Sequence, residues 1–362
     1  MNKRKNRQII VLLLLLVICI GGYLGIRAYN KHAEEQKKAA EEKVRLCNLE
    51  QIESVTINNR EGEFSFQLKE NAWVYLQDPD FPVDQNKFKS FISDLDYLTA
   101  ERSFQPSESL SSYGFDSPSC SLTATDKEGK TFTLLVGDKA EGGSTKNYYA
   151  MEKDGKLVHT ISSTFVKYLQ YSLYDLAELE TFPSLSEENI TSLRLVSQDK
   201  TIVVEKDDST QNAVEEESAE NSDQESKEKA VKYVLSVMKE GKTIKKLTIT
   251  PEAASNDDKT SPEGLLSNLL QRLSWLSFEK SIEYKPDQQA LAEYGIIEPA
   301  IILTVNYLDE KDDKSVNAAF TLTIGSSNQE GDAYYAVKDN SLMVNLISSR
   351  TVNVLSDMLN AF

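Results

Sequence analysis

Histidine, the side chain most often used for proton transfer or metal binding near neutral pH, occurs at only two positions, His32 and His159. His32 lies in a stretch rich in Ala, Glu and Lys, so His159, in the strand-like sequence LVHTI, is the one candidate base. Two distant histidines cannot form H-E-x-x-H or another histidine-rich zinc site. No GxSxG nucleophile elbow and no cysteine–histidine pair in a suitable context occurs. The sequence therefore predicts no catalytic residue, no metal site and no cofactor.

Two Gly-Lys-Thr triplets, at residues 129–131 and 241–243, resemble the end of a phosphate-binding loop. Both lack the upstream glycine of GxxxxGK[ST], so they predict turns and no nucleotide site. Carboxylates are abundant, with 57 acidic residues, and spacing along the chain selects no acid–base pair among them.

Two tyrosine pairs, Tyr148–Tyr149 and Tyr334–Tyr335, could contact a ligand or a partner. Adjacent residues of a strand face opposite sides of the sheet, so one ring of each pair enters the core and the other faces outward. An outward ring in each pair could form a platform for a sugar or a peptide. Half-exposed strand tyrosines are also common as plain structural residues, and the sequence leaves both interpretations open.

The formal net charge of −17 limits the classes of partner. Nucleic-acid binding depends on Lys and Arg that neutralise phosphates, so an acidic protein of this kind is not expected to bind nucleic acid. The same charge argues against the protein lying flat on an anionic lipid surface.

The N-terminal region predicts a membrane anchor. Residues 9–26, IIVLLLLLVICIGGYLGI, contain no charge, and a helix of 18 residues is about 27 Å long, close to the thickness of the bilayer core. The preceding cluster KRKNR favours a cytoplasmic N-terminus, so we expect a cytoplasmic basic tip and transmembrane anchor over residues 1–27, with the remainder extracytoplasmic. A cleaved signal peptide is the alternative, but it would have a shorter apolar run and a small-residue cleavage site.

Residues 28–46 are rich in helix-forming Ala, Glu and Lys and lack a continuous apolar seam, which predicts a solvated helical stalk. Cys47 and Cys120, the cysteines beyond the anchor, are too few for a disulfide framework. They could pair with each other or lie buried as free thiols, and the sequence does not decide between these.

The rest of the chain predicts an α+β protein with two tandem copies of a mainly antiparallel sheet-plus-helix module. Alternating apolar and polar residues predict strands such as SVTIN and FSFQL, whereas three- and four-residue apolar steps predict helices over residues 84–98 and 163–176. Five segments recur in the same order, which indicates an internal duplication. The recurring pairs are DYLTAERS and SWLSFEKS, SYGFDSP and EYGIIEP, TFTLLVGD and AFTLTIGS, NYYAM and AYYAV, and TISSTFVKYLQYSL and LISSRTVNVLSDML.

The duplicated Tyr-Gly-x-x-x-Pro motif predicts structural punctuation. Glycine allows a left-handed turn, and proline blocks a helix and favours an extended strand start. The motif residues are Tyr113, Gly114 and Pro118 in the first copy and Tyr294, Gly295 and Pro299 in the second.

These features predict a first repeat over residues 47–180 and a second over residues 181–362. The second contains an acidic insertion at about residues 207–230, with almost no apolar side chains, which predicts a disordered loop.

An N-terminal anchor followed by paired YG…P, F-T-L-x-[VI]-G and YYA segments resembles the bacterial domain-of-unknown-function family numbered 4340. The resemblance covers roughly residues 50–360. Members of that family look like extracytoplasmic, membrane-tethered proteins, and some are associated with ABC-type transport or gliding-motility components. The resemblance therefore implies a location and a class of partner. It transfers no catalytic residue, and the acidic insertion departs from the plainest family pattern.

We therefore expect a membrane-anchored extracytoplasmic binding or scaffold protein, an accessory subunit of an ABC-type transporter or of another envelope assembly. Two alternatives stay open. One is a carboxylate-dependent hydrolase that acts on cell-wall glycan or peptide. The other is a tethered solute-binding protein, although a strand-heavy repeat differs from the alternating βα pattern of most such proteins.

Overall fold

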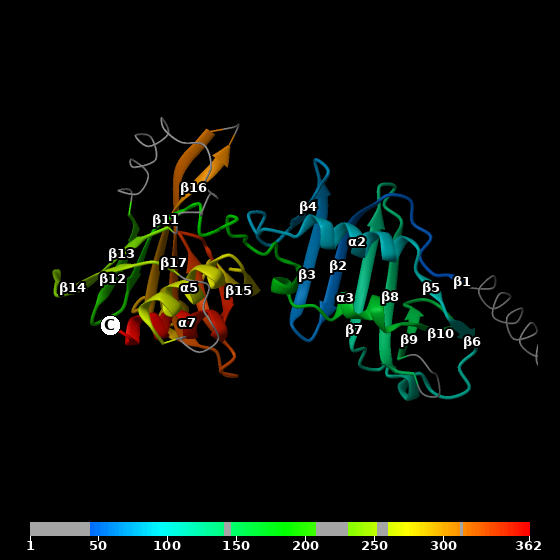
Figure 1. Cartoon of the computed structure of the whole chain (residues 1–362). Helices are drawn as coiled ribbons and strands as arrows, with labels where there is room; N and C mark the ends of the chain where they lie inside the picture. Colours follow the sequence, from blue (N-terminus) through cyan, green and yellow to red (C-terminus); the bar gives the residue numbers. More distant parts are fainter. Residues whose placement is uncertain (1–43, 141–145, 208–230, 252–259, 312–313) are drawn as a thin grey trace, which may run out of the picture. The chain divides into compact units, whose positions relative to one another are not determined.

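The computed structural model describes residues 44–140, 146–207, 231–251, 260–311 and 314–362 (Figure 1). They form two compact units, and the boundary between these falls after Ser172. We call the part up to Ser172 unit 1 and the part from Leu173 onward unit 2, and each is described by itself.

Unit 1 is built on an eight-stranded sheet with the strand order β4-β3-β2-β7-β8-β9-β10-β6. All its pairings are antiparallel. A separate two-stranded pair joins β1 (Val44–Arg45) to β5 (Thr99–Ala100). The strands of the large sheet are β2 (Ile52–Asn59), β3 (Gly62–Lys69), β4 (Ala72–Tyr75), β6 (Arg102–Phe104), β7 (Cys120–Asp126), β8 (Thr131–Lys139), β9 (Asn147–Glu152) and β10 (Val158–Ser162).

Two helices, α2 (Gln85–Asp96) and α3 (Ser163–Leu169), pack on the buried side chains of this sheet. Helix α2 begins where the Asp84 carboxylate accepts hydrogen bonds from two backbone N–H groups of the first turn, which would otherwise lack partners. Its apolar stripe is fully buried through Phe88, Phe91 and Leu95. Aromatic rings fill much of the space beneath it, with the ring centroids of Phe66 and Phe88 4.6 Å apart.

Unit 2 is built on a nine-stranded sheet with the order β14-β13-β12-β11-β16-β17-β18-β19-β15, again antiparallel at every pairing. Its helices are α5 (Pro262–Leu273), α6 (Gln288–Glu293) and α7 (Ser349–Asn360). The strands are β11 (Ile190–Val196), β12 (Thr201–Lys206), β13 (Tyr233–Lys239), β14 (Lys242–Ile249), β15 (Phe278–Tyr284), β16 (Ile301–Lys311), β17 (Lys314–Ser327), β18 (Ala333–Lys338) and β19 (Met343–Ser348).

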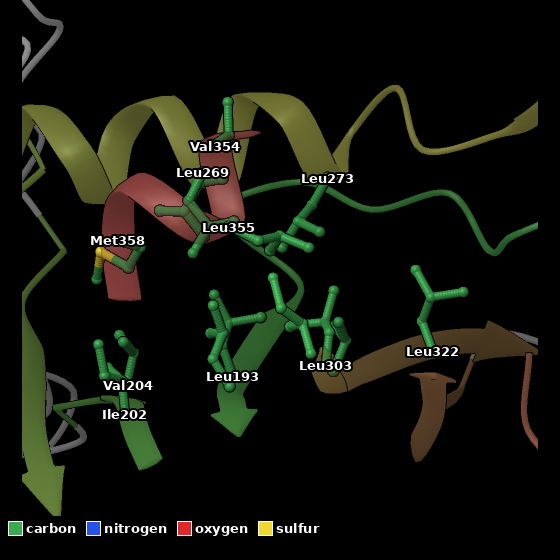
Figure 2. Packing of buried hydrophobic residues seen from close by; sticks show 14 of the residues in the cluster. Leu193, Ile202, Val204, Leu269, Leu273, Leu303, Leu322, Val354, Leu355 and Met358 are labelled. Atoms are coloured by element: carbon green, nitrogen blue, oxygen red, sulfur yellow. The ribbon is translucent and has the colours of Figure 1, made fainter. Parts of the chain in front are cut away.

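The core of unit 2 lies between its sheet and the helices α5 and α7, which pack side by side (Figure 2). Leu269 and Leu273 reach down from α5, while Leu355 and Met358 reach down from α7. They meet a floor of aliphatic side chains from neighbouring strands. The labelled floor residues are Leu193, Ile202, Val204, Leu303 and Leu322.

The two units follow the same chain path. Strands β11 to β13 correspond to β2 to β4, strand β15 corresponds to β6, and strands β16 to β19 correspond to β7 to β10. With these correspondences the two strand orders are the same, except that unit 2 has β14 as an added edge strand. Helices α5 and α7 take the places of α2 and α3 in this path. The predicted duplication is therefore confirmed, as is the antiparallel α+β class.

Several element bounds differ from the sequence-based ones. The helix expected over residues 163–176 ends at Leu169, and the 3-10 turn η2 (Leu173–Leu176) follows as part of unit 2. The side-chain amide of Asn59 donates to the carbonyl oxygens of Leu169 and Tyr171, both at 2.8 Å, which satisfies the helix end. At the end of the expected stalk, Val44 and Arg45 form strand β1 instead of helix.

The unit boundary precedes the residue-180 boundary expected from sequence because the connecting segment packs within unit 2. The ring of Phe182 lies 4.7 Å from that of Phe278 and 5.4 Å from that of Phe320. Asp175 forms an ion pair of 3.5 Å with Lys280 on β15.

The expected anchor and most of the expected stalk, residues 1–43, lie outside the described residues, as does the acidic insertion from residue 208 to residue 230. The insertion connects β12 to β13, which pair directly as Lys206 opposite Tyr233. Among the described residues, no helix has the length and apolar character needed to span a bilayer.

Candidate functional site

In unit 1 the Tyr-Gly motif and the glycine at the end of β8 contact each other. Gly114 takes a φ of 82°, a conformation that side chains with a Cβ rarely adopt. Gly137 packs directly on the carbonyl oxygen of Tyr113, and a Cβ atom added at Gly137 would overlap that oxygen. The β8–β9 register shifts at this point, between Val136 and Lys139, so the strand bulges where the turn approaches it.

Unit 2 repeats this contact. Gly295 has a φ of 71°, and Gly325 packs on the carbonyl oxygen of Tyr294. The register of β17 and β18 shifts at the same place, between Ile324 and Ser327. Two motifs that look separate in the sequence are therefore one structural feature, which we call the Tyr-Gly interlock.

The second tyrosine of each pair packs on the interlock. The Tyr149 ring meets the Tyr113 ring edge to face with the centroids 5.1 Å apart. The Tyr335 and Tyr294 centroids lie 4.5 Å apart. In each unit the ring of the second tyrosine thus contacts the ring of the motif tyrosine, which favours a structural role for Tyr149 and Tyr335.

The hydroxyl groups of the motif tyrosines also have partners. Tyr113 accepts a hydrogen bond from the backbone N–H of Ser107 at 3.3 Å. Tyr294 donates to Glu283 at 2.7 Å, and burial together with this carboxylate raises the Tyr294 pKa well above its ordinary value. The tyrosine and glycine residues of the motif thus make contacts within the fold of their own unit. Pro118 and Pro299 each lie two residues before a strand, β7 and β16 respectively.

The first tyrosines of the pairs differ between the units. Tyr334 packs against the hydrophobic core of unit 2. Tyr148 lies on the wall of a groove in unit 1 with a volume of about 670 Å³. Of the four tyrosines proposed as ligand or partner contacts, Tyr148 therefore lines a groove formed by described residues of unit 1.

The groove lies where several elements of unit 1 end. The β2–β3 turn, the end of β8, the start of β9 and the end of α3 all contribute to it, and an adjoining hollow of about 290 Å³ continues it toward Pro118 and Ser121. The groove-lining residues are Asn59, Arg60, Glu61, Ser119, Gly137, Asp138, Lys139, Tyr148 and Gln170.

Hydrogen bonds fix the walls of the groove. Asn59 holds the end of α3 through its two 2.8 Å bonds to backbone carbonyls. The Ser119 hydroxyl donates to the carbonyl oxygens of Val136 and Gly137, both at 3.2 Å, and so ties β7 to the bulge in β8. The backbone around the groove is therefore held in place by the same contacts that build the fold.

Four charged side chains line the groove: Arg60, Glu61, Asp138 and Lys139. All four are exposed, and within the described part of the chain none forms an ion pair. Two cations and two anions thus line this groove.

Unit 2 lacks these charged residues at the equivalent positions, apart from one acidic residue in the turn that joins β11 to β12. The strand pairings place Gln198 where unit 1 has Arg60, and Ser326 and Ser327 where it has Asp138 and Lys139. The helix is also longer, since α7 has 12 residues and α3 has 7. Lys200, in the hairpin turn, is used to donate to the carbonyl oxygen of Leu359 near the end of α7, at 2.8 Å.

Sequence comparison assigns this fold to a family. The profile of the family described as Domain of unknown function (DUF4340) matches residues 73–265 and, a second time, residues 263–362. The chain belongs to the DUF4340 family. The two matches begin before α2 and within α5, the corresponding helices of the two units, as expected for a duplicated module. No curated protein and no solved structure matches the chain significantly.

The candidate base of this DUF4340 protein, His159, is buried in β10, and its Nδ1 lies 2.8 Å from the hydroxyl oxygen of Ser103 on β6. Burial lowers the His159 pKa. The equivalent pair in unit 2 is Asn345 and Ser281, where the Ser281 hydroxyl donates to the Asn345 side-chain oxygen at 3.1 Å. Because asparagine cannot act as a base, the shared geometry indicates that the pair holds an edge strand in place.

Cys47 and Cys120 are free and buried in this DUF4340 chain, so the disulfide alternative is not observed between them. Burial raises the pKa of both thiols, and that of Cys120 reaches about 11. Among the described residues, no cluster of three or more His, Cys, Asp or Glu side chains could hold a metal ion.

Sequence reasoning missed the charged residues of the groove. The motifs recognisable in the sequence are those that the two copies share, and these residues form the Tyr-Gly interlock. The groove lies where the copies differ, at Arg60, Asp138 and Lys139. A position-by-position search for charges present in one copy alone would have found these residues.

Proposed function

We propose that this protein is a single-pass membrane protein whose two units lie outside the cytoplasm and act as a binding or scaffold module. The favoured role is an accessory subunit of an ABC-type transporter or of another envelope assembly. The uncharged stretch at residues 9–26, preceded by a basic cluster, supports the anchor and its orientation. The features shared with membrane-tethered DUF4340 proteins support the class of partner.

The observation that carries the binding role is the groove of unit 1. It combines an aromatic ring, Tyr148, with four charged side chains that have no ion-pair partner in the described chain. Rigid aromatic side chains and arginine supply much of the energy of protein–protein contacts, whereas flanking charges mainly set specificity and association rate. The groove therefore suits a polar segment of a partner protein that carries charges of both signs.

Site-directed photo-crosslinking in intact cells tests this role. A photoreactive phenylalanine analogue replaces Tyr148 in one strain and Tyr334, the matched tyrosine of unit 2, in another. We expect Tyr148 to yield a discrete crosslinked product with an integral membrane transport or envelope component. That product should be lost when Arg60→Glu and Lys139→Glu are added, because both charges face the groove.

Two outcomes would contradict the proposal. One is the same set of crosslinked products from both positions. The other is an undiminished Tyr148 product in the charge-reversed variant.

The size of the groove also favours a second candidate, a tethered solute-binding protein. Small-molecule pockets commonly measure about 300–1,000 Å³, and the groove, at about 670 Å³, falls within this range. Equilibrium dialysis of the purified chain against free amino acids and against cell-wall disaccharides tests it. Saturable binding that Arg60→Glu abolishes would favour this candidate over the partner-protein role.

The hydrolase alternative has weaker support. The groove contains two carboxylates, Glu61 and Asp138, but both are exposed. A general acid at neutral pH normally depends on burial to raise its pKa. Burial raises the pKa of the Glu187 carboxyl, but this residue lies in unit 2 and does not line the groove.

A further inference from the structure

The hairpin of β16 and β17 is much longer than its counterpart in unit 1. Strands β7 and β8 are joined through Lys127, Glu128 and Gly129, which follow Asp126 and precede Lys130. In unit 2 the equivalent positions are Tyr307 and Ala318, and the two strands continue past them, pairing as far as Lys311 opposite Lys314. We call residues 308–311 and 314–317 the arm. It is the orange ribbon that extends beyond its neighbouring strands in unit 2 (Figure 1).

The fold does not depend on the arm, because unit 1 completes the same sheet with a short turn. The arm also adds little to the core, since its residues are exposed or only partly buried. The arm is therefore an addition to the shared module, and neither the sheet nor the core accounts for it.

One edge of the arm has no strand beside it. Strand β18 pairs with β17 up to Leu322, and Asp339 then bonds to both the N–H and the carbonyl oxygen of Thr321. From residue 314 to residue 320, no described strand lies on that side. Backbone groups alternate in direction along a strand, so every second residue before Thr321 directs its N–H and C=O to the same side as Thr321. On the open edge these residues are Ser315, Asn317 and Ala319.

Among the described residues, the outer strands of the two large sheets are protected against strand pairing, whereas this edge is not. Strand β14 carries Lys242, Lys245 and Lys246 and has a bulge at its pairing with β13. Strand β15 has two register shifts, and β4 and β6 of unit 1 span only four and three residues. Charges, bulges and short length are the usual means of preventing edge pairing. The open edge of β17, in contrast, has the uncharged sequence SVNAA over residues 315–319 and pairs with β16 without a bulge.

We propose that the open edge of β17, in the arm and the residues directly after it, binds a second copy of this chain, with β17 of each copy pairing antiparallel to β17 of the other about a two-fold axis at Asn317. The axis follows from the limits of the open edge, because Asn317 is the midpoint between residue 314 and residue 320. Two-fold symmetry is the commonest arrangement of protein oligomers.

The side chains of the edge are complementary to themselves in this register. Ser315 lies opposite Ala319 of the second copy, and Val316, which is 51% exposed in the single chain, lies opposite Ala318. No charged side chain between residues 315 and 319 faces a like charge, so the pairing brings no electrostatic cost at the centre. Each copy supplies the backbone donors and acceptors of Ser315, Asn317 and Ala319 to the other.

Disulfide trapping in membranes tests this geometry with the full chain. Facing residues of a hydrogen-bonded antiparallel pair have Cα atoms about 5.5 Å apart, which suits a disulfide. In a Cys19→Ser background, where Cys47 and Cys120 are buried, we expect Asn317→Cys to form a covalent dimer under mild oxidation. The matched control is Thr248→Cys on the lysine-bearing edge β14, which is expected to crosslink at least tenfold less. Equal crosslinking at the two positions, or none at residue 317, would overturn the proposal.

Two further variants separate pairing from folding. Replacing residues 308–317 with Lys-Glu-Gly, the connection that unit 1 uses, should leave the melting temperature within a few degrees of the parent and reduce the dimer fraction at least tenfold. Asn317→Pro removes the outward N–H at the centre, whereas Asn317→Thr retains it, so proline alone should lower the dimer fraction. Dimers that persist unchanged in the shortened and proline variants would contradict arm pairing.

Discussion

The helices of unit 1 pack on their sheet largely through aromatic rings, whereas those of unit 2 pack through leucines. At matched positions of the first helix, Phe88 and Phe91 of α2 correspond to Leu266 and Leu269 of α5, and all four are fully buried. The strand orders are nevertheless the same, apart from the added edge strand β14. The chain path is therefore determined by the spacing of apolar residues and by the Tyr-Gly interlock, while the identity of the core side chains can vary.

The two units also differ at the end of their last helix. In unit 1 the helix stops at Leu169, and Asn59 holds its end beside the groove. In unit 2 the helix continues to Asn360, and Lys200 of the matching turn bonds to Leu359. The features that build the fold are those that the copies share. The candidate binding site lies where the copies differ.

The largest expected effect comes from the core. Phe91→Ala should lower the free energy of unfolding of unit 1 by about 4 kcal/mol, and Leu269→Ala should lower that of unit 2 by about 3 kcal/mol, because a larger ring leaves a larger cavity. Urea unfolding followed by Trp73 fluorescence reports on unit 1, since Trp73 is buried there and Trp275 in unit 2 is 77% exposed. Hydrogen exchange resolved by peptide reports on unit 2. An equal or reversed order of the two effects would contradict the difference between the cores.

The next effect concerns the shared interlock. Gly137→Ala and Gly325→Ala should each cost about 2–3 kcal/mol, since the added Cβ meets a backbone carbonyl oxygen that cannot move freely. The control is Gly129→Ala, at φ 81° with no atom near the new Cβ, where only backbone strain of about 1 kcal/mol is expected. Urea unfolding followed by Trp73 fluorescence measures the Gly137 and Gly129 variants in unit 1, and peptide-resolved hydrogen exchange measures the Gly325 variant in unit 2. A loss at Gly137 no larger than at Gly129 would mean that the interlock is not a rigid contact.

A smaller effect is expected at the helix ends. Asn59→Ala removes two hydrogen bonds and should destabilise unit 1 by about 1.5 kcal/mol, whereas Lys200→Ala removes one from unit 2 and should cost about 0.5 kcal/mol. Hydrogen exchange of the last turns of α3 and α7 shows whether each loss is local. Unchanged exchange at α3 in the Asn59 variant would contradict the role assigned to this side chain.

The smallest effect is a difference in pH dependence. Burial lowers the pKa of His159 below that of the unfolded chain, so the unfolded state binds the proton more tightly. The contribution of His159 to the stability of the fold is therefore fully present above its pKa in the unfolded chain, about 6.5. This contribution is lost as the pH falls through the lower pKa of His159 in the folded state. His159→Asn, which installs the residue found at this position in unit 2, should flatten this part of the pH profile. Parallel profiles for the two proteins between pH 8 and pH 5 would rule out this contribution.

Much of this fold could be predicted from the sequence because its strands alternate regularly and its motifs occur twice. The position of helix α2 followed from the spacing of Phe88, Phe91 and Leu95. The end of α3 could not be predicted, because it depends on Asn59, which is distant in sequence and close only in the folded unit. Strand β14 was missed because its five leading residues are all exposed and give little apolar alternation.

The candidate site was less accessible to sequence reasoning. Tyr148 was identified as a candidate contact, but its counterpart Tyr334 and its neighbour Tyr149 were indistinguishable from it by residue type. Their different surroundings arise from packing, since Tyr149 meets Tyr113 and Tyr334 meets the core of unit 2. Arg60, Asp138 and Lys139 come from different hairpins, and only the sheet brings them to one groove.

The most direct test of the account replaces the groove charges of unit 1 with the residues that unit 2 carries at the same positions. The variant is Arg60→Gln, Asp138→Ser and Lys139→Ser, and the matched control introduces the reverse changes in unit 2: Gln198→Arg, Ser326→Asp and Ser327→Lys. The measurement is the yield of the Tyr148 photo-crosslinked partner in intact cells. We predict at least a tenfold loss for the unit 1 variant, with an unchanged melting temperature, and a yield like that of the parent for the unit 2 variant. An undiminished yield from the unit 1 variant would contradict the assignment of the groove as the binding site.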